Sequence, residues 1–397
     1  MQMIVFFITL IVYILIVVPY SRLDKRIRQQ LQQKPRIVWG TTPIIAIRFG
    51  SLASRLYGYK SDSVVYYVSH LNNPTDYDYN FGEYIGKYFK AGGLINRGLL
   101  NIIMPYFVLL WASFKYDIFH YYFNGGFLSS SKLVYKFEPL LLKMAGKKII
   151  VVPYGGDARL ESATRKYKFN FCMDCYPAIR ECKEGSIKEN LDRYGKYADI
   201  VLGCADLVDD LPRHDGIWLY PIDLSEWQPV LNTQDSDVVK VVHATNHWKY
   251  KGTRYLIAAI DKLKSEDYPV ELTLVEKMSN QEAKKIYEKA DIIADQFIGG
   301  AYAQFAIEGM ALGKPVMCYL REDLYRHHPE WNECPIVNTN PDNIVEQLIN
   351  LITDSKLRHE LGQRGPGYVK KYHSLEAVGE MEDKYYRYLW NGEEKSW

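Results

Sequence analysis

The most informative segment of the chain is DQFIGGAYAQFAIEGMALGKPVMC, residues 295–318. It predicts the end of a strand, a turn, a helix that begins near Tyr302, and a second strand. Gly299 and Gly300 allow the backbone of the turn to approach a ligand closely. The free N–H groups and positive dipole end of the helix would then face a diphosphate. Glu308, further along the helix, can accept hydrogen bonds from both hydroxyls of a ribose. The alternative is a packed helix with one exposed glutamate.

A second segment, VVHATNHWKYKGTRYL at residues 241–256, has the same order of strand, loop and helix. Lys251-Gly252 opens the helix, and Lys251 can neutralise a phosphate as a point charge. Lys-Gly pairs are common in surface turns, but this one follows the first strand of a predicted domain. Ligands of α/β proteins bind at such carboxyl ends. Further side chains predicted to contact the ligand are His243, Asn246 and Lys249.

Short apolar runs alternate with helical stretches from about residue 37 onward, as in RIVWG, DSVVYYVSH and KKIIVVPYGG. Such runs are typical of strands buried on both faces of a parallel sheet. Residues 221–240 interrupt the pattern with Pro, Asp, Ser and Thr, which predicts a linker. A second unit of similar size follows. We therefore expect an α/β protein with two doubly wound, Rossmann-like domains that face a cleft.

Residues 1–20 are predicted to be a transmembrane anchor. The run MIVFFITLIVYILIVVPY at 3–20 carries no charge and reaches nearly 30 Å as a helix. A signal peptide is one alternative, but the run lacks a basic region before it and a small-residue cleavage site. A buried core helix is the other. Residues 21–36 are a basic juxtamembrane segment, which by the positive-inside rule places the body in the cytoplasm on a single-pass anchor.

A further apolar stretch, LLNIIMPYFVLLWASF at 99–114, has three interpretations. It is a buried helix leading into the strand YDIFHYYF, a face of the first domain that dips into the membrane, or a second span. The order of helix and strand favours the first.

The overall composition is that of a globular protein. Its 397 residues include 49 basic and 47 acidic side chains, a net charge of +2. This balance offers no bulk electrostatic case for nucleic acid as a partner. Cysteines in this arrangement are typical of free thiols in a reducing compartment. A structural zinc or a redox pair is the alternative, because a C-x-x-C pair occurs with two further thiols. The zinc ligands would be Cys172, Cys175, Cys182 and Cys204.

These motifs together resemble the GT-B glycosyltransferases, in particular the family-4 (group 1) type. The resemblance rests on Lys251-Gly252, on EGMALGKPV at 308–316, on LYPIDLSEWQP at 219–229 and on LRHELGQRGPGYVKKYHSLEAV at 357–378. It implies a GT-B fold with an acceptor-side domain at 37–222 and a nucleotide-sugar domain at 223–379. A C-terminal helix at 380–397 would cross back onto the first domain.

Two departures from the family pattern concern the donor. The first of the family's two glutamates, which commonly contacts the donor sugar, is replaced by Gly300. The family's donor-loop arginine, a few positions before Lys251, is also missing, and Asn246 to Lys249 stand in that stretch. These changes imply a different sugar, a subgroup in which Tyr302 lies near the sugar, or an inactive relative.

The acceptor side is predicted from VVPYGGDARL at 151–160. Asp157 would orient or deprotonate an acceptor hydroxyl, or it caps the following helix. The opening loop after the first strand should also line the cleft. The acceptor-side residues are Gly40, Thr41, Thr42, Gly155, Gly156 and Asp157.

The sequence thus predicts a membrane-anchored cytoplasmic glycosyltransferase with Asp157, Lys251 and Glu308 as catalytic residues. Lys251 and the helix N-terminus would stabilise the leaving diphosphate. The resemblance implies retention of configuration, no required cofactor and no divalent metal. The partners are a nucleotide-diphosphate sugar, the membrane and a lipid-linked or membrane-associated glycan acceptor. The alternatives are a non-catalytic GT-B scaffold or partner subunit, a nucleotide-sugar epimerase, or a phosphorylase.

Overall fold

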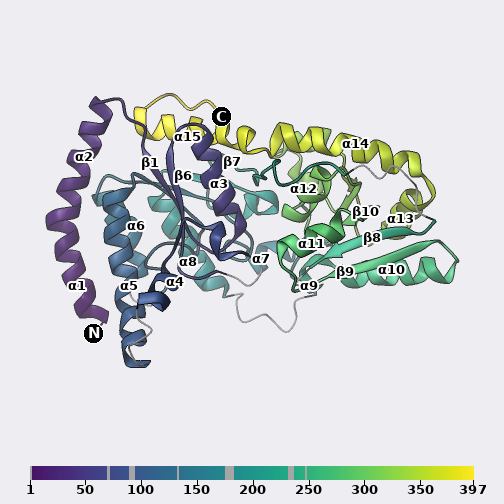
Figure 1. The fold of residues 1–397 in the computed structure, drawn as a ribbon, viewed down its shortest axis with the longest axis horizontal. Coiled ribbons are helices and arrows are strands. Elements are labelled where there is room, and N and C mark those ends of the chain that lie inside the picture. The colour runs from purple at the N-terminus through teal and green to yellow at the C-terminus, as the bar shows by residue number, and fades with distance from the viewer. Residues whose placement is uncertain are drawn as a thin grey trace.

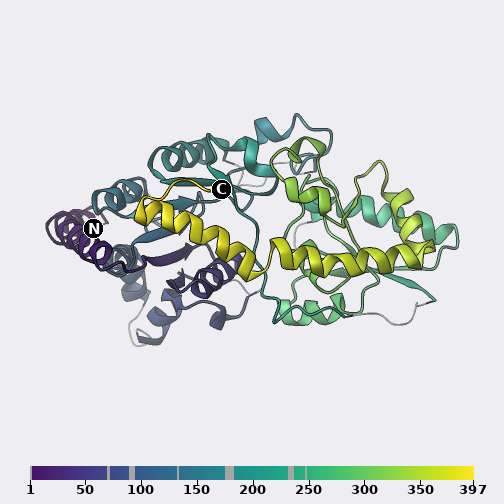
Figure 2. The same cartoon turned by 90° about the horizontal axis from the view of Figure 1, so that it is seen from above.

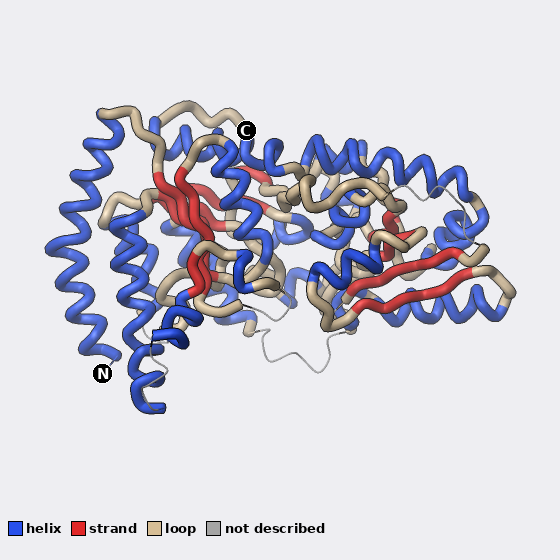
Figure 3. The backbone as a smooth tube through the Cα atoms, viewed as in Figure 1, coloured by secondary structure: helices blue, strands red, loops and turns tan. Residues whose placement is uncertain are grey.

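The computed structural model describes residues 2–68, 72–88, 94–131, 134–174, 183–230, 237–245 and 248–397. Two separate groups of strands lie side by side along the long axis of the molecule (Figure 3). Each group forms one parallel sheet with helices on both faces, because most strands are followed by a helix that returns to the start of the next strand.

The first sheet has the strand order β3-β2-β1-β4-β5-β6-β7. Its strands are β1 Arg36–Thr41, β2 Lys60–Val65, β3 Tyr79–Asn80, β4 Ile118–Tyr121, β5 Lys148–Val151, β6 Ile200–Gly203 and β7 Gly216–Ile217. Its helices are α3 Ile45–Leu56, α4 Phe81–Tyr88, α5 Leu94–Lys115, α6 Glu138–Met144, α7 Glu161–Thr164 and α8 Glu184–Tyr197. Helix α5 leads into β4, as the sequence predicts for the apolar stretch at 99–114.

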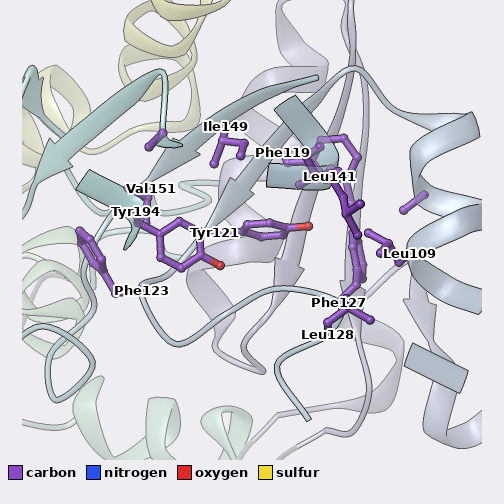
Figure 4. Close-up of a cluster of buried hydrophobic side chains, with 14 of the residues drawn as sticks. Leu109, Phe119, Tyr121, Phe123, Phe127, Leu128, Leu141, Ile149, Val151 and Tyr194 are labelled. Carbon is purple, nitrogen blue, oxygen red and sulfur yellow. The ribbon is translucent and has the colours of Figure 1, made fainter. Parts of the chain in front are cut away.

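The core of this domain lies between the sheet and the helices α5, α6 and α8. Figure 4 shows Phe119, Tyr121, Phe127 and Tyr194 packed together, and all four are buried. The Tyr121 hydroxyl donates to Oε1 of the buried Glu138 at 2.7 Å, so the carboxylate is satisfied inside the apolar core.

The second sheet has the order β12-β11-β10-β8-β9. Its strands are β8 Val239–Ala244, β9 Val270–Val275, β10 Ile292–Ala294, β11 Val316–Cys318 and β12 Val337–Asn338. Its helices are α9 Trp248–Lys251, α10 Thr253–Ser265, α11 Asn280–Tyr287, α12 Gln304–Ala311, α13 Ile344–Thr353 and α14 Ser355–Tyr372. The predicted α/β class with two doubly wound sheets is therefore confirmed.

The last helix, α15 (Leu375–Asn391), leaves α14 and runs across the first domain (Figure 2). It packs on α3, where the hydroxyl of Ser54 donates to Oε2 of Glu382 at 2.7 Å. The hydroxyl of Tyr386 lies 2.8 Å from Nε2 of His120. The chain therefore starts and ends on the first domain, which ties the two sheets together.

The N-terminal apolar segment is one long helix made of α1 Gln2–Val12, a π-helical turn Tyr13–Val17 and α2 Val18–Gln30. Residues Met3–Gln30 are long and apolar enough to cross a membrane. The helix lies alongside α5 on the outer side of the first domain (Figure 1). Its length fits the predicted anchor, but the helix is also docked on the protein.

Candidate functional site

The carboxyl edge of the second sheet holds a partly buried ion pair. Nζ of Lys251, at the end of α9, lies 2.7 Å from Oδ1 of Asp295, just after β10. Asp295 has no exposed surface, and its Oδ2 also accepts the backbone N–H of Ala303 at 3.3 Å. Ala303 caps α12, so one carboxylate joins the lysine and the helix N-terminus.

Glu308 lies in α12 close to this ion pair. Burial raises the pKa of Glu308 to about 8, the charge of Lys251 opposes that shift, and the charge of Asp295 reinforces it. Glu308 is therefore largely protonated near neutral pH in the ligand-free protein, so it can donate as well as accept a hydrogen bond. The contact of Glu308 with a ribose stays a prediction.

The two glycines of the donor loop have different surroundings. A Cβ on Gly299 would lie 2.2 Å from Cζ of Phe171, a residue of the first domain. Gly300 has φ +89°, and a Cβ there would lie 3.2 Å from Cβ of Arg321. The close approach predicted for a ligand is thus made at Gly299 by an aromatic ring of the protein itself.

That ring belongs to a stretch of the first domain that reaches over the second, which we name the crossing segment (residues 165–174). Tyr167 lies under the guanidinium of Arg321 at 3.5 Å, and the rings of Phe169 and Tyr319 are 6.0 Å apart. Two ion pairs accompany these contacts, Lys168 with Asp342 and Asp174 with Arg254. The crossing segment therefore joins the first domain to the carboxyl edge of the second sheet.

Three side chains at the same edge carry buried polar atoms without a hydrogen-bond partner among the described residues. These atoms are Oε1 of Glu276, which follows β9, Nη2 of Arg321, which follows β11, and both amide atoms of Gln304, which begins α12. Buried polar atoms are normally satisfied, so unpaired ones indicate a place where a ligand or water binds. An acceptor and a donor at the edge that also holds Lys251 fit a polar, charged ligand.

His243 lies under the site rather than in it. It has no exposed surface, its Nδ1 lies 2.7 Å from the carbonyl oxygen of Ala294, and its Nε2 lies 2.8 Å from Oγ1 of Thr253. Burial lowers the pKa of His243 to about 4, so the ring is neutral. Both ring nitrogens already have partners, and a direct bond from His243 to a donor would require one of them to break.

The other predicted donor residues lie as follows. Lys249 is exposed on α9, and Asn246 lies outside the described residues. The hydroxyl of Tyr302 is 2.8 Å from both the Tyr368 hydroxyl and Nε2 of His373. Tyr302 also lines a small cavity between the domains, together with Trp218 and His373. The Tyr302 hydroxyl is thus engaged in hydrogen bonds at the junction of the domains.

On the acceptor side, Asp157 is buried and accepts three backbone N–H groups at 3.0 Å, from Phe123, Tyr154 and Gly155. Burial raises the pKa of Asp157 to about 6 against the opposing effect of these hydrogen bonds. The carboxylate holds the loop in place and does not cap α7. A catalytic role for Asp157 stays a prediction.

The acceptor-side glycines and threonines meet at the carboxyl edge of the first sheet. A Cβ on Gly155 or Gly156 would meet nothing within 4 Å, so both face open space. At Gly40 a Cβ would lie 2.9 Å from the Val64 carbonyl oxygen. Thr41 donates to the Gly126 carbonyl at 3.0 Å, and Thr42 donates to Asn124 Oδ1 at 3.3 Å.

The predicted zinc ligands are only partly within the described residues. Cys172 and Cys204 are buried, whereas Cys175 and Cys182 lie outside the described ranges. No group of three or more His, Cys, Asp or Glu side chains that could hold a metal occurs among the residues that the structure describes.

Sequence reasoning missed Asp295, Arg321 and Phe171. Asp295 begins the segment 295–318, and an acidic residue directly after an apolar strand is a signal that could have identified it. The sequence holds no such signal for Arg321 or Phe171. The position of Arg321 depends on the strand order, and that of Phe171 depends on a contact between the domains.

No protein-family profile matches the chain, and no curated protein matches it. Solved structures do. Sucrose-phosphate synthase from Thermosynechococcus elongatus has a TM-score of 0.58 at 14% identity, over 91% of this chain and 100% of that one. A glycosyltransferase from Rickettsia africae has a TM-score of 0.54 at 12% identity, over 90% and 100%.

HepE from Anabaena, solved in complex with UDP-glucose, has a TM-score of 0.52 at 10% identity, over 88% of this chain and 99% of that one. A Listeria monocytogenes protein described as a UDP-N-acetylglucosamine 2-epimerase has a TM-score of 0.50 at 11% identity. The chain therefore has the GT-B fold of these glycosyltransferases, as its sequence motifs imply.

Proposed function

We propose that the protein is a glycosyltransferase that transfers a sugar from a nucleotide-diphosphate sugar bound at the carboxyl edge of the second sheet. The observation that carries this proposal is the placement of Lys251 at the N-terminus of α12, through Asp295, with Glu308 one turn further along the same helix, in a GT-B fold. A lysine and a helix N-terminus suit the diphosphate, and a partly buried carboxyl group suits the ribose.

The proposal assigns a role to each group of residues at the carboxyl edges of the two sheets. Lys251 and the N–H groups at the start of α12 stabilise the negative charge that develops on the leaving diphosphate. Glu308 holds the nucleoside, so that the sugar points toward the first domain. Gly155 and Gly156, with the loop of Thr41 and Thr42, leave room for the acceptor. Asp157 holds that loop and remains the candidate for orienting the acceptor hydroxyl.

The finer features of the proposal are these. The donor is a UDP-sugar, supported by the UDP-glucose complex of HepE. Transfer proceeds with retention and without a divalent metal, as the resemblance to family 4 implies. The acceptor is a lipid-linked or membrane-associated glycan on the cytoplasmic side, supported by the long apolar helix at the N-terminus. Domain closure excludes water, which would otherwise hydrolyse the donor.

A donor panel tests the proposal. Purified full-length protein is incubated with labelled UDP-sugars and a membrane extract, and lipid-extractable label is measured. We expect transfer from one donor, loss of it in Lys251→Ala and Glu308→Ala, and retention of it in Lys262→Ala, an exposed lysine on α10. UDP binding is measured in parallel by calorimetry.

The second candidate is a nucleotide-sugar epimerase, which the fold of the Listeria protein favours. It predicts conversion of one UDP-sugar into its epimer without any acceptor. An epimer in the same incubation overturns the transferase proposal, and the absence of both UDP binding and transfer leaves the scaffold alternative.

A further inference from the structure

One face of the N-terminal helix is packed against the first domain. Buried side chains recur at every third or fourth position, which is the spacing of one helix face. They are Phe6, Thr9, Tyr13, Val17 and Ser21. Tyr13 Oη lies 3.2 Å from Oγ of Ser113, and the rings of Tyr20 and Phe114 are 5.2 Å apart. The helix therefore follows α5 over most of its length (Figure 1).

The second half of the helix is held by polar contacts to three other parts of the domain. Arg22 donates to the Met144 carbonyl at 2.9 Å, and Asp24 pairs with Arg36 at 2.6 Å. Gln29 donates to the carbonyl of Trp390 in α15 at 2.5 Å. Detaching the helix would break all of these contacts and expose the buried face of α5.

The opposite face of the helix is exposed. It is apolar throughout the first half, whereas Arg22, Arg26, Gln29 and Gln30 are exposed among the apolar side chains of the second half. Ile4 is 64% exposed and Leu15 69%, and the row continues to Leu31 at 63%. The other exposed apolar side chains of the helix are Met3, Phe7, Ile8, Ile11, Ile14, Ile16, Tyr20, Leu23 and Ile27. Soluble monomers rarely expose contiguous apolar surface of this size, so the face requires an apolar partner.

Further exposed apolar side chains stand on the parts of the domain beside the helix. Phe107 on α5 is 57% exposed, and Phe137, 47% exposed, stacks on Phe6 with ring centroids 5.7 Å apart. We name the exposed side chains of the helix together with Phe107 and Phe137 the apolar face. Two basic residues in the second half of the helix, Arg22 and Arg26, are exposed, and anionic headgroups would attract them. Lys25 and Arg28 are half-buried and contact the Gly146 carbonyl and Asp117 of the domain.

An upright crossing conflicts with this docking. Phe137 follows Lys136, which forms an exposed ion pair with Glu189 at 2.7 Å. If residues 3–20 crossed the bilayer while still docked, Phe6 and the Phe137 ring stacked on it would lie toward the far end of the span. Lys136, the chain neighbour of Phe137, would then be carried into or across the membrane with its ion pair. Charged side chains exposed to hydrocarbon are costly. The docked helix is therefore incompatible with an upright span.

We propose that the helix Met3–Gln30 does not cross the membrane but lies lengthwise in the cytoplasmic leaflet of an anionic bilayer. The apolar face is immersed, and the packed face keeps the first domain at the surface. The N-terminus then stays on the same side as the catalytic body. This inference rests on the membrane location in the proposed function and replaces the single-pass anchor by an in-plane one.

The side on which the N-terminus lies tests the proposal directly. An epitope tag is added before Met1, a second tag after Trp397, and closed vesicles with the cytoplasmic face outward are treated with protease. We expect both tags to be digested at the same protease concentration. Protection of the N-terminal tag alone would overturn the proposal in favour of a span.

A matched pair of variants tests the face itself. Leu15→Asp changes the apolar face, and Leu56→Asp changes an exposed leucine of α3 outside it, 55% exposed. Binding to vesicles that contain anionic phospholipid should fall about tenfold or more in Leu15→Asp and stay unchanged in Leu56→Asp. Equal binding of the two variants would contradict the proposal. UDP affinity, measured on the same samples, shows separately whether the donor site is intact.

Discussion

Nζ of Lys251 lies 2.7 Å from Oδ1 of Asp295, a carboxylate with no exposed surface that also accepts the N–H of Ala303. Asp295 thus presents to Lys251 and to the N-terminus of α12 the same kind of negative charge that a bound diphosphate would present. The carboxylate orients Lys251, and it also repels an incoming anion.

Asp295→Asn removes that repulsion while preserving the shape of the side chain. We expect UDP affinity at low ionic strength to rise about 3- to 10-fold, with a smaller gain at high salt. The transfer rate should fall, because Lys251 loses the partner that orients it. Calorimetry and the transfer assay measure the two effects. Asp261→Asn, an exposed aspartate on α10, is the control and should change neither.

The raised pKa of Glu308 leads us to expect that the stability of the protein depends on pH. Its folded pKa of about 8 lies above its ordinary value, so the folded state binds the proton more tightly than the unfolded state does. The free energy of unfolding therefore falls as pH rises from about 4.5 to about 8 and then levels off. Glu308→Gln removes this loss. Relative to the wild type, the variant should gain about 1–3 kcal/mol in urea unfolding at pH 9 and nothing at pH 4. An equal difference at both pH values would contradict the assignment.

Variants of Gly299 and Phe171 test whether the contact between these two residues holds the crossing segment in place. Gly299→Ala places a methyl group 2.2 Å from Cζ of Phe171, so the crossing segment must move. We expect a lower melting temperature and altered UDP affinity in Gly299→Ala. The double variant Gly299→Ala, Phe171→Ala should recover the melting temperature in part, because the clash is gone. If Phe171→Ala lowers the melting temperature of the Gly299→Ala variant further, the contact between Gly299 and Phe171 does not cause the loss of stability.

Tyr302 distinguishes a role at the sugar from a role at the domain junction. Tyr302→Phe removes the hydroxyl that bonds Tyr368 and His373. The structural role predicts a loss of about 1–2 kcal/mol in unfolding free energy with an unchanged KM for the donor. A raised KM with unchanged stability would instead support the contact to the sugar that the sequence suggests. Tyr388→Phe, an exposed tyrosine on α15, is the control.

Much of the architecture could be predicted from the sequence, because local sequence patterns determine which segments form strands and helices. Buried parallel strands are short apolar runs, and helices between them carry periodic polar faces. The turn with Gly299 and Gly300, the helix with Glu308 and the strand that ends before Lys251 were therefore recognisable. The length and apolar character of residues 3–20 were recognisable for the same reason.

The partners of these residues were decided by the tertiary structure. Asp295 meets Lys251 because β10 pairs with β8, and that pairing brings residues 44 positions apart to one edge. Phe171 meets Gly299 because two domains close on each other. The apolar helix packs on α5 through Tyr13 and Ser113, which determines where its exposed face points. Local periodicity determines which element a segment forms, whereas contacts between distant segments depend on the packing of the whole chain.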